Sequence, residues 1–305
     1  MAFLYALPGA VAEGLIWGLM AIGVYISYKI LDIADLTVDG SICTGACVCA
    51  LLLGMGGIPA WVCVIAALLA GALTGVVTGL LHTRLGIPSI LAGILTQLML
   101  YSVNLLILGG KSMLSVDPRA NNLLVHMSDT TGSIVVLGII VAAVIVALYL
   151  FFYTEIGLTL KSTGDNPDMS RAQGVDVDRN KVIGLAIANG IVALAGALLA
   201  QYKGSANIND GRGAIVIGLA AIFIGLSVSL KIKPNFVVSL IGVIGGGIVY
   251  YIVYNFVILL GLKTDYLKML SALIVALFLG IPYLKTKYFT KQKDLHSLPG
   301  GDRHA

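Results

Sequence analysis

Charged side chains are scarce in this sequence, and their scarcity excludes an ordinary soluble protein. Only 11% of the 305 residues are Asp, Glu, Lys or Arg, whereas 58% are hydrophobic and the mean hydropathy is +0.99. Soluble domains are about one quarter charged and about half apolar. We therefore predict an all-α integral membrane protein in a lipid bilayer, because a helix satisfies its own backbone hydrogen bonds there.

Motifs of catalysis and nucleotide binding are lacking as well. No HExxH or GxSxG motif occurs, and the four histidines are scattered without a carboxylate partner. The run Gly109-Gly110-Lys111-Ser112 resembles the end of a phosphate-binding loop, but Leu105 stands where its first glycine is required. We predict no enzymatic activity and no cofactor bound by this chain. The net charge of +4 reflects lysines expected in the cytoplasm, so no nucleic acid partner is implied.

The few cysteines do not indicate a metal site. Cys43 and Cys47 share a helix face, yet no His or carboxylate joins them. All four cysteines lie in apolar segments, which is typical of small buried thiols. The first 28 residues contain no Lys or Arg, so no cleavable signal peptide is predicted.

Hydrophobic segments recur along most of the chain. A membrane-spanning helix needs about 20 apolar residues. We expect about nine transmembrane helices, in one membrane domain over residues 1–284, followed by a basic, disordered cytoplasmic tail over 285–305. The predicted segments are 9–31, 41–55, 58–81, 88–108, 132–153, 182–202, 213–230, 235–258 and 266–283.

Basic residues predict the orientation, because they accumulate in cytoplasmic loops. If the polar stretch 154–181 lies inside, thirteen of the 19 basic residues fall on the cytoplasmic side. The N-terminus is then outside and the C-terminus inside the cell.

Two polar breaks interrupt the hydrophobic pattern in similar contexts. Each follows a long apolar segment and precedes a helix rich in small residues, which predicts two inverted repeats, an arrangement common in transporters. The breaks are either ordinary loops or discontinuities whose freed backbone groups line a watery path. On the second interpretation, the path residues are Asp35, Leu36, Thr37, Asp39 and Ser41 in the first break, and Asn207, Asn209 and Asp210 in the second.

Further polar residues lie within the apolar segments. Glu13 faces either the bundle interior or the membrane interface. Amides at four other positions predict hydrogen bonds between helices or contacts along the path, namely Gln97, Asn104, Asn189 and Asn255. Glycines at 71, 75 and 79 predict close helix packing, within one subunit or across a dimer.

The most polar window of the chain, 153–181, predicts a short helix. Asn166 can cap it, Pro167 suits its first position and Gly174 can end it in a left-handed turn. A membrane protein with one short capped helix on a charged loop is expected to present that helix to a partner.

The same window resembles a known family. Gly164-Asp165-Asn166-Pro167, followed by Ala172 and Gly174-Val175, is similar to the Gly-x-Asn-Pro motif of the branched-chain amino acid/ribose permease superfamily of ABC importers. The segment 33–41 is similar to the Ile-Asp-Leu-Ser-Val-Gly-Ser stretch of ribose-type permeases, from which it departs at Asp39. Many members also have a glycine pair where this chain has Gly225-Leu226. The pattern looks closest to permeases of the tryptophan/tyrosine type.

This resemblance implies a transmembrane permease subunit of an ABC importer in the bacterial inner membrane, for a small solute that we expect to be an aromatic or branched-chain amino acid. A cytoplasmic ATPase subunit would bind ATP and Mg, and an extracellular or periplasmic solute-binding lipoprotein would deliver the solute. Two permease copies, a homodimer by default, would enclose the path. The coupling helix that docks on the ATPase would comprise Asn166, Pro167, Asp168, Met169, Arg171, Ala172 and Gly174.

Other functions stay open at this point. The solute could be a sugar or a nucleoside. In a different class of protein, the chain would be an ion-coupled secondary transporter that acts alone, or a structural or signalling membrane protein without solute flux. Dependence of transport on an ATPase separates these alternatives.

Overall fold

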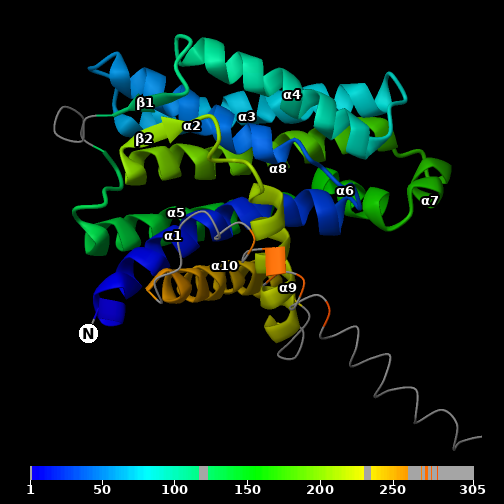
Figure 1. Ribbon diagram of the computed structural model, residues 1–305. Coiled ribbons are helices and arrows are strands. Elements are labelled where there is room, and N and C mark those ends of the chain that lie inside the picture. The colour runs from blue at the N-terminus through cyan, green and yellow to red at the C-terminus, as the bar shows by residue number, and fades with distance from the viewer. Residues whose placement is uncertain are drawn as a thin grey trace, which may run out of the picture.

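The computed structural model shows a bundle of helices with one small sheet (Figure 1). It describes residues 2–116, 123–229 and 235–259, with a few single positions between 269 and 280. The helices are α1 (Ala2–Tyr25), η1 (Ile26–Ile30), α2 (Val38–Gly54), α3 (Ala60–Thr83), α4 (Ser89–Ile107), α5 (Thr130–Phe152), α6 (Glu155–Asp165), α7 (Pro167–Ala172), α8 (Val177–Lys203), α9 (Ala214–Ser229) and α10 (Phe236–Leu259), and the strands are β1 (Met113–Ser115) and β2 (Ser205–Asn207).

The hydrophobic segments coincide with helices wherever the structure describes them. Each of the first eight predicted segments overlaps one of α1–α5 and α8–α10. Among the described residues, six helices are long and apolar enough to cross a membrane, and α2 and α9 are shorter apolar helices. The ninth predicted segment lies outside the described residues except for those few single positions, and the predicted tail over 285–305 lies outside them entirely. The structure is that of an integral membrane helix bundle.

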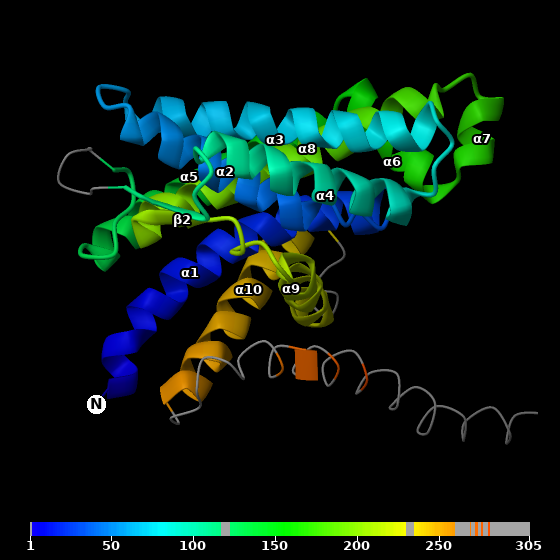
Figure 2. The same ribbon diagram turned by 45° about the horizontal axis from the view of Figure 1, so that its top comes forward.

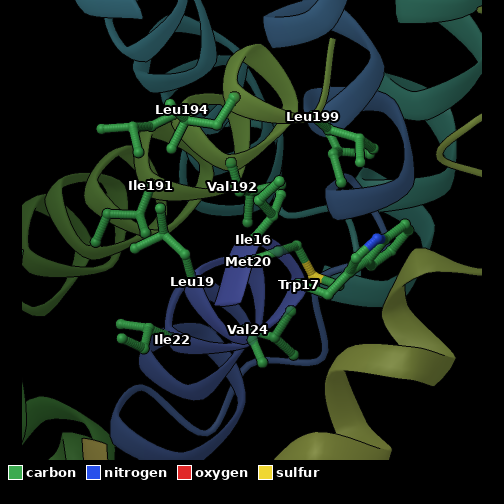
Figure 3. Packing of buried hydrophobic residues seen from close by; sticks show 14 of the residues in the cluster. Ile16, Trp17, Leu19, Met20, Ile22, Val24, Ile191, Val192, Leu194 and Leu199 are labelled. Atoms are coloured by element: carbon green, nitrogen blue, oxygen red, sulfur yellow. The ribbon is translucent and has the colours of Figure 1, made fainter. Parts of the chain in front are cut away.

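Helix α8 is the centre of the packing. It contacts α1, α2 and α3, and nearly all of its residues beyond Ala188 are buried. Figure 3 shows apolar side chains of α1 facing those of α8. By contrast, α3, α4 and α5 expose large apolar side chains on their outer surfaces, such as Leu73, Leu106 and Ile139. These surfaces fit a lipid environment, because water-soluble proteins rarely expose large contiguous apolar surfaces.

Small residues allow the close approach of helices to α8. A Cβ atom on Gly75 would overlap the carbonyl oxygen of Leu185, and one on Gly45 would overlap that of Ala193. The predicted tight packing of the glycines at 71, 75 and 79 is confirmed within one subunit. All three lie against α8.

The two ends of the bundle differ in structure. At one end, β1 and β2 pair antiparallel, with Leu114 opposite Ala206. The N-terminus of α1 lies at this end, whereas α6 and α7 lie at the opposite end (Figures 1 and 2).

The polar stretch 154–181 contains more helix than predicted. We expected one short helix there and the next span to begin at 182, but α6 precedes α7 and α8 begins at Val177. Side-chain caps explain the difference. Thr154 accepts a hydrogen bond from the amide of Gly157 at 3.3 Å, and Asp176 accepts one from the amide of Arg179 at 3.0 Å. Polar residues begin these helices, so a hydropathy pattern underestimates their extent.

Candidate functional site

The first break is buried in the bundle. Asp35 is 2% exposed, and its Oδ1 accepts a 2.9 Å hydrogen bond from the backbone amide of Thr37. Its Oδ2 accepts a 2.7 Å bond from Nδ2 of Asn189, which stands near the middle of α8. Just before it, Asp32 has a left-handed φ of +54°, which is uncommon for a residue other than glycine. The break is therefore not an ordinary surface loop.

Hydroxyl groups extend this polar cluster across three further helices. Ser41 of α2 donates to Oδ1 of Asn189 at 2.6 Å and lies 2.7 Å from the hydroxyl of Thr74 in α3. Thr37 lies 2.8 Å from the hydroxyl of Thr78, which in turn donates to Thr96 of α4 at 3.0 Å. Interhelical hydrogen bonding is thus confirmed for Asn189. Of the predicted path residues, the structure brings Asp35, Thr37 and Ser41 together here.

Unlike Thr37, the threonines that α3 and α4 contribute to this cluster were not predicted from the sequence. Thr74 and Thr78 are four residues apart, so they share one face of α3, and each directly precedes a glycine that packs on α8. This spacing of threonines beside glycines is the sequence pattern from which their place in the cluster could have been predicted. Leu36 is half-buried, and its backbone lies against Gly93 of α4, where a Cβ would come within 2.7 Å of the Leu36 amide nitrogen.

The second break folds back onto the first turns of α2. The carboxylate of Asp39 accepts 2.9 Å hydrogen bonds from the backbone amides of Gly213 and Ile215, so a side chain of α2 caps α9. The thiol of Cys43 accepts from the amide of Gly211 at 3.1 Å and donates to the carbonyl of Ile208 at 3.1 Å. Both breaks therefore meet at the N-terminal end of α2.

The remaining predicted path residues lie in this second break. Asn207 belongs to β2, and its side chain accepts a 2.9 Å hydrogen bond from the amide of Asn209. Asn209 is exposed and Asp210 is half-buried.

A cavity of about 440 Å³ opens beside the second break. Its walls come from α2, α4 and the segment between β2 and α9. Of the predicted path residues, only Asp39 lines it. The lining residues are Asp39, Gly40, Cys43, Gln97, Leu98, Tyr101, Asn104, Ile208 and Arg212.

The predicted short helix is confirmed as α7. The side chain of Asn166 accepts a 3.0 Å hydrogen bond from the amide of Met169, Pro167 occupies the first position, and Gly174 has φ of +83°. Ser170 of α7 is buried. All of the predicted coupling residues are exposed at this end of the bundle, namely Asn166, Pro167, Asp168, Met169, Arg171, Ala172 and Gly174. Arg171 forms an exposed 3.3 Å ion pair with Asp178.

Helix α6 connects α7 to the bundle at two places. Gly164 lies so close to η1, the continuation of α1, that a Cβ there would overlap the carbonyl oxygen of Ile30. Thr163 accepts a 3.1 Å hydrogen bond from Nδ2 of Asn180 in the first turn of α8. Through α6, the exposed helix α7 is thus held against η1 and α8.

Three of the polar residues singled out in the apolar segments make no interhelical hydrogen bond among the described residues. Asn255 donates to the carbonyl of Tyr251 in its own helix at 3.2 Å. Asn104 and Gln97 line the cavity instead. Glu13 is half-buried within the first span.

Comparison with known proteins agrees with these features. A family model described as "Branched-chain amino acid transport system / permease component" matches residues 9–282. The chain is 36% identical over 269 residues to a tyrosine transport system permease protein of Clostridioides difficile (strain R20291), covering 88% of each chain. It is 24% identical over 255 residues to a ribose import permease protein of Escherichia coli (strain K12), covering 80% of this chain and 75% of the relative. No solved structure gives a significant match.

The chain therefore belongs to the family of permease components of branched-chain amino acid transport systems. It is a multi-pass membrane protein and a permease component of an ABC-type import system. The resemblance that the Gly-x-Asn-Pro motif indicated is confirmed.

Proposed function

We propose that this chain forms the translocation path of an ABC importer for an amino acid in the bacterial inner membrane. The tyrosine transport relative, at 36% identity over 88% of both chains, supports an aromatic amino acid more than the ribose relative supports a sugar. A solute-binding lipoprotein outside the cell delivers the solute. ATP and Mg bind to a separate ATPase, and this chain binds no cofactor itself.

The single observation that carries the proposal is the exposed, capped helix α7 on a polar hairpin. In a membrane protein, a charged helix with an apolar exposed side chain such as Met169, 60% exposed, is suited to docking on a cytoplasmic protein. Its contacts through α6 reach η1, the continuation of α1, and the start of α8. Docking of the ATPase on Asn166–Gly174 would therefore move η1, which leads into the break with Asp35, and α8, which carries Asn189.

An inverted repeat is supported by the helix contacts. If α1, α2 and α3 correspond to α8, α9 and α10, the contacts between the halves match in pairs. The contact of α1 with α10 corresponds to that of α8 with α3, and the contact of α2 with α8 corresponds to that of α9 with α1. The two halves run in opposite directions, because α1 begins at the end of the bundle where α8 ends (Figure 1). We infer that α1–α3 and α8–α10 are the two halves. The breaks after α1 and α8 then occupy equivalent places, as alternating access requires.

Two copies of the permease enclose the path in this proposal. The N-terminus faces the outside of the cell, and α7 and the C-terminus face the cytoplasm, as the distribution of basic residues favours. Asp35, Leu36, Thr37, Asp39, Ser41, Asn207, Asn209 and Asp210 would control the passage where the two breaks meet.

Single cysteines at two exposed methionines test the orientation and the docking surface together. Met169 in α7 and Met127 at the opposite end are 60% and 65% exposed, and the four native cysteines are buried. In intact cells we expect a membrane-impermeant maleimide to label Met127→Cys but not Met169→Cys. A crosslinker on Met169→Cys should capture the ATPase, and the same crosslinker on Met127→Cys should not.

Transport assays complete the test. We expect Ala172→Glu to abolish uptake while the protein still inserts in the membrane, because the charge lies in the docking surface. Uptake that continues in a strain without the ATPase would instead establish a secondary transporter, and labelling of Met169→Cys from outside would reverse the orientation.

A further inference from the structure

The cavity between α2, α4 and the second break has the chemistry of a solute site. It lies beside the segment that joins β2 to α9. This segment starts at the end of the bundle opposite α7 and runs toward the middle of the bundle (Figure 2). If α7 is cytoplasmic, the segment starts on the side from which a binding protein delivers its solute. Its volume of about 440 Å³ is in the range of small-molecule sites.

Asn104 is the first sign that this cavity is a binding site. The residue is 1% exposed, yet its Oδ1 has no hydrogen-bond partner among the described residues. A buried acceptor without a partner is costly, and such a group in a native structure requires an explanation. Rotation about the last side-chain torsion can present either the oxygen or the nitrogen of this amide to the cavity. A bound solute with a hydrogen-bond donor would satisfy the oxygen.

Arg212 and Asp39 give the cavity one charge of each sign. Arg212 is exposed and forms no ion pair within the ranges that the structure covers. Asp39 accepts from the neutral backbone amides of Gly213 and Ile215 at the start of α9, and it forms no ion pair with any described residue. A carboxylate has about four acceptor positions, so Asp39 can accept further hydrogen bonds.

The remaining wall is apolar and aromatic. Leu98 and Tyr101 of α4 line the cavity and are 64% and 46% exposed. An aromatic ring of a solute gains from stacking on Tyr101, beyond the area it buries.

We propose that this cavity binds the zwitterionic head group of an amino acid. The carboxylate of the solute pairs with Arg212, its ammonium group donates to Asp39 and to Oδ1 of Asn104, and its apolar side chain lies against Leu98 and Tyr101. A sugar offers neither charge, so the same residues select against it. This inference rests on the proposed importer function and names the residues that recognise the solute.

Thermal unfolding of the purified full-length permease tests the proposal without a binding protein. The probes are L-phenylalanine, phenethylamine, which lacks the carboxylate, 3-phenylpropionate, which lacks the ammonium group, and ribose. We expect L-phenylalanine to raise the Tm, and each truncated analogue to need about tenfold higher concentration, the usual effect of losing one charge-assisted hydrogen bond. Ribose should have no effect.

Two variants assign the effect to the cavity. Arg212→Gln should weaken the response to L-phenylalanine about tenfold, whereas Lys203→Gln, at another exposed cation near the end of α8, should not change it. Asn104→Leu removes an unpaired acceptor. We therefore expect a Tm without ligand at least as high as that of the wild type, together with a weaker response to L-phenylalanine.

Several results would overturn the assignment. A lower Tm of Asn104→Leu without ligand would make Asn104 a structural residue. An unchanged response in both cavity variants, no response of the wild type to L-phenylalanine, or an equal response to ribose would each contradict the zwitterion site. The proposed importer function would survive these outcomes, because it depends on the crosslink between α7 and the ATPase.

Discussion

The amide of Asn189 donates a 2.7 Å hydrogen bond to the carboxylate of Asp35, although 154 positions separate the two residues. Both side chains are buried, at 0% and 2% exposure. A buried carboxylate requires donors, and here they are the Asn189 amide and the Thr37 backbone amide. The bond therefore fixes the first break against the middle of α8.

Replacing Asn189 should destabilise the protein. Asn189→Leu leaves Oδ2 of Asp35 without its donor and Ser41 without its acceptor. We expect a loss of about 2–3 kcal/mol in the free energy of unfolding, since the carboxylate stays buried. Asn255→Leu is the matched control, because among the described residues the Asn255 side chain bonds to its own helix. The measurement is denaturant unfolding of the purified protein.

Exchanging the Asp35 carboxylate and the Asn189 amide tests the same contact by denaturant unfolding. The double variant Asp35→Asn with Asn189→Asp keeps one carboxylate and one amide in contact, so it should be more stable than either single variant. Equal or additive losses would show that the two side chains do not act as a pair.

Removal of the Asp39 carboxylate should loosen α9. Asp39→Ala leaves the amides of Gly213 and Ile215 without an acceptor, and we expect a loss of about 2–3 kcal/mol in the free energy of unfolding. Asp129→Ala removes an exposed cap with a single bond from Gly132, and should cost about 1 kcal/mol or less. Hydrogen exchange of the first turn of α9 would locate the effect, and unchanged protection there would contradict it.

The glycine contacts on α8 predict a large difference between two equivalent substitutions. Gly75→Ala forces a methyl group into the Leu185 carbonyl and should cost about 1–3 kcal/mol. Gly138→Ala in α5 meets nothing within 4 Å and should be neutral or slightly stabilising, since alanine favours a helix. The measurement is the Tm of each purified variant, and we expect that of Gly75→Ala to be the lower. Equal values would exclude tight packing of α3 on α8.

The cap of α7 should matter for transport more than for global stability. Asn166→Ala removes the bond to the Met169 amide, which costs about 1 kcal/mol in a helix of only six residues. We expect uptake to fall severalfold with little change in Tm, because α7 is exposed. Asn166→Asp retains a capping oxygen and should restore uptake. Failure of that rescue would show that the cap is not the cause.

The sequence predicts the membrane bundle well because its signal is local. Apolar runs mark the helices, and the cap, proline and glycine of α7 are each identified by the side chain or backbone that they require. The additional helix α6 and the early start of α8 were missed, since a hydropathy pattern does not register helix starts that are capped by polar residues such as Thr154 and Asp176.

Much of the candidate site depends on long-range contacts. Asp35 and Asn189 were both noted as unusual, but nothing in the sequence shows that they touch. The contribution of Thr74 and Thr78 follows from their position on the glycine face of α3. The cavity itself needs three segments far apart in sequence, and only the fold brings Arg212 beside Asn104.

The contact of Gly164 with the Ile30 carbonyl limits how the polar hairpin can move. Helix α6 touches η1, the continuation of α1, and, through Thr163, the beginning of α8. A tilt of α6 therefore displaces two antiparallel helices at once. Rearrangement of one helix alone would require one of these contacts to break. Helices α1 and α8 are therefore mechanically joined at the α7 end of the bundle. The hydrogen bond between Asp35, in the break that follows η1, and Asn189 of α8 is a second connection between them, in the interior of the bundle.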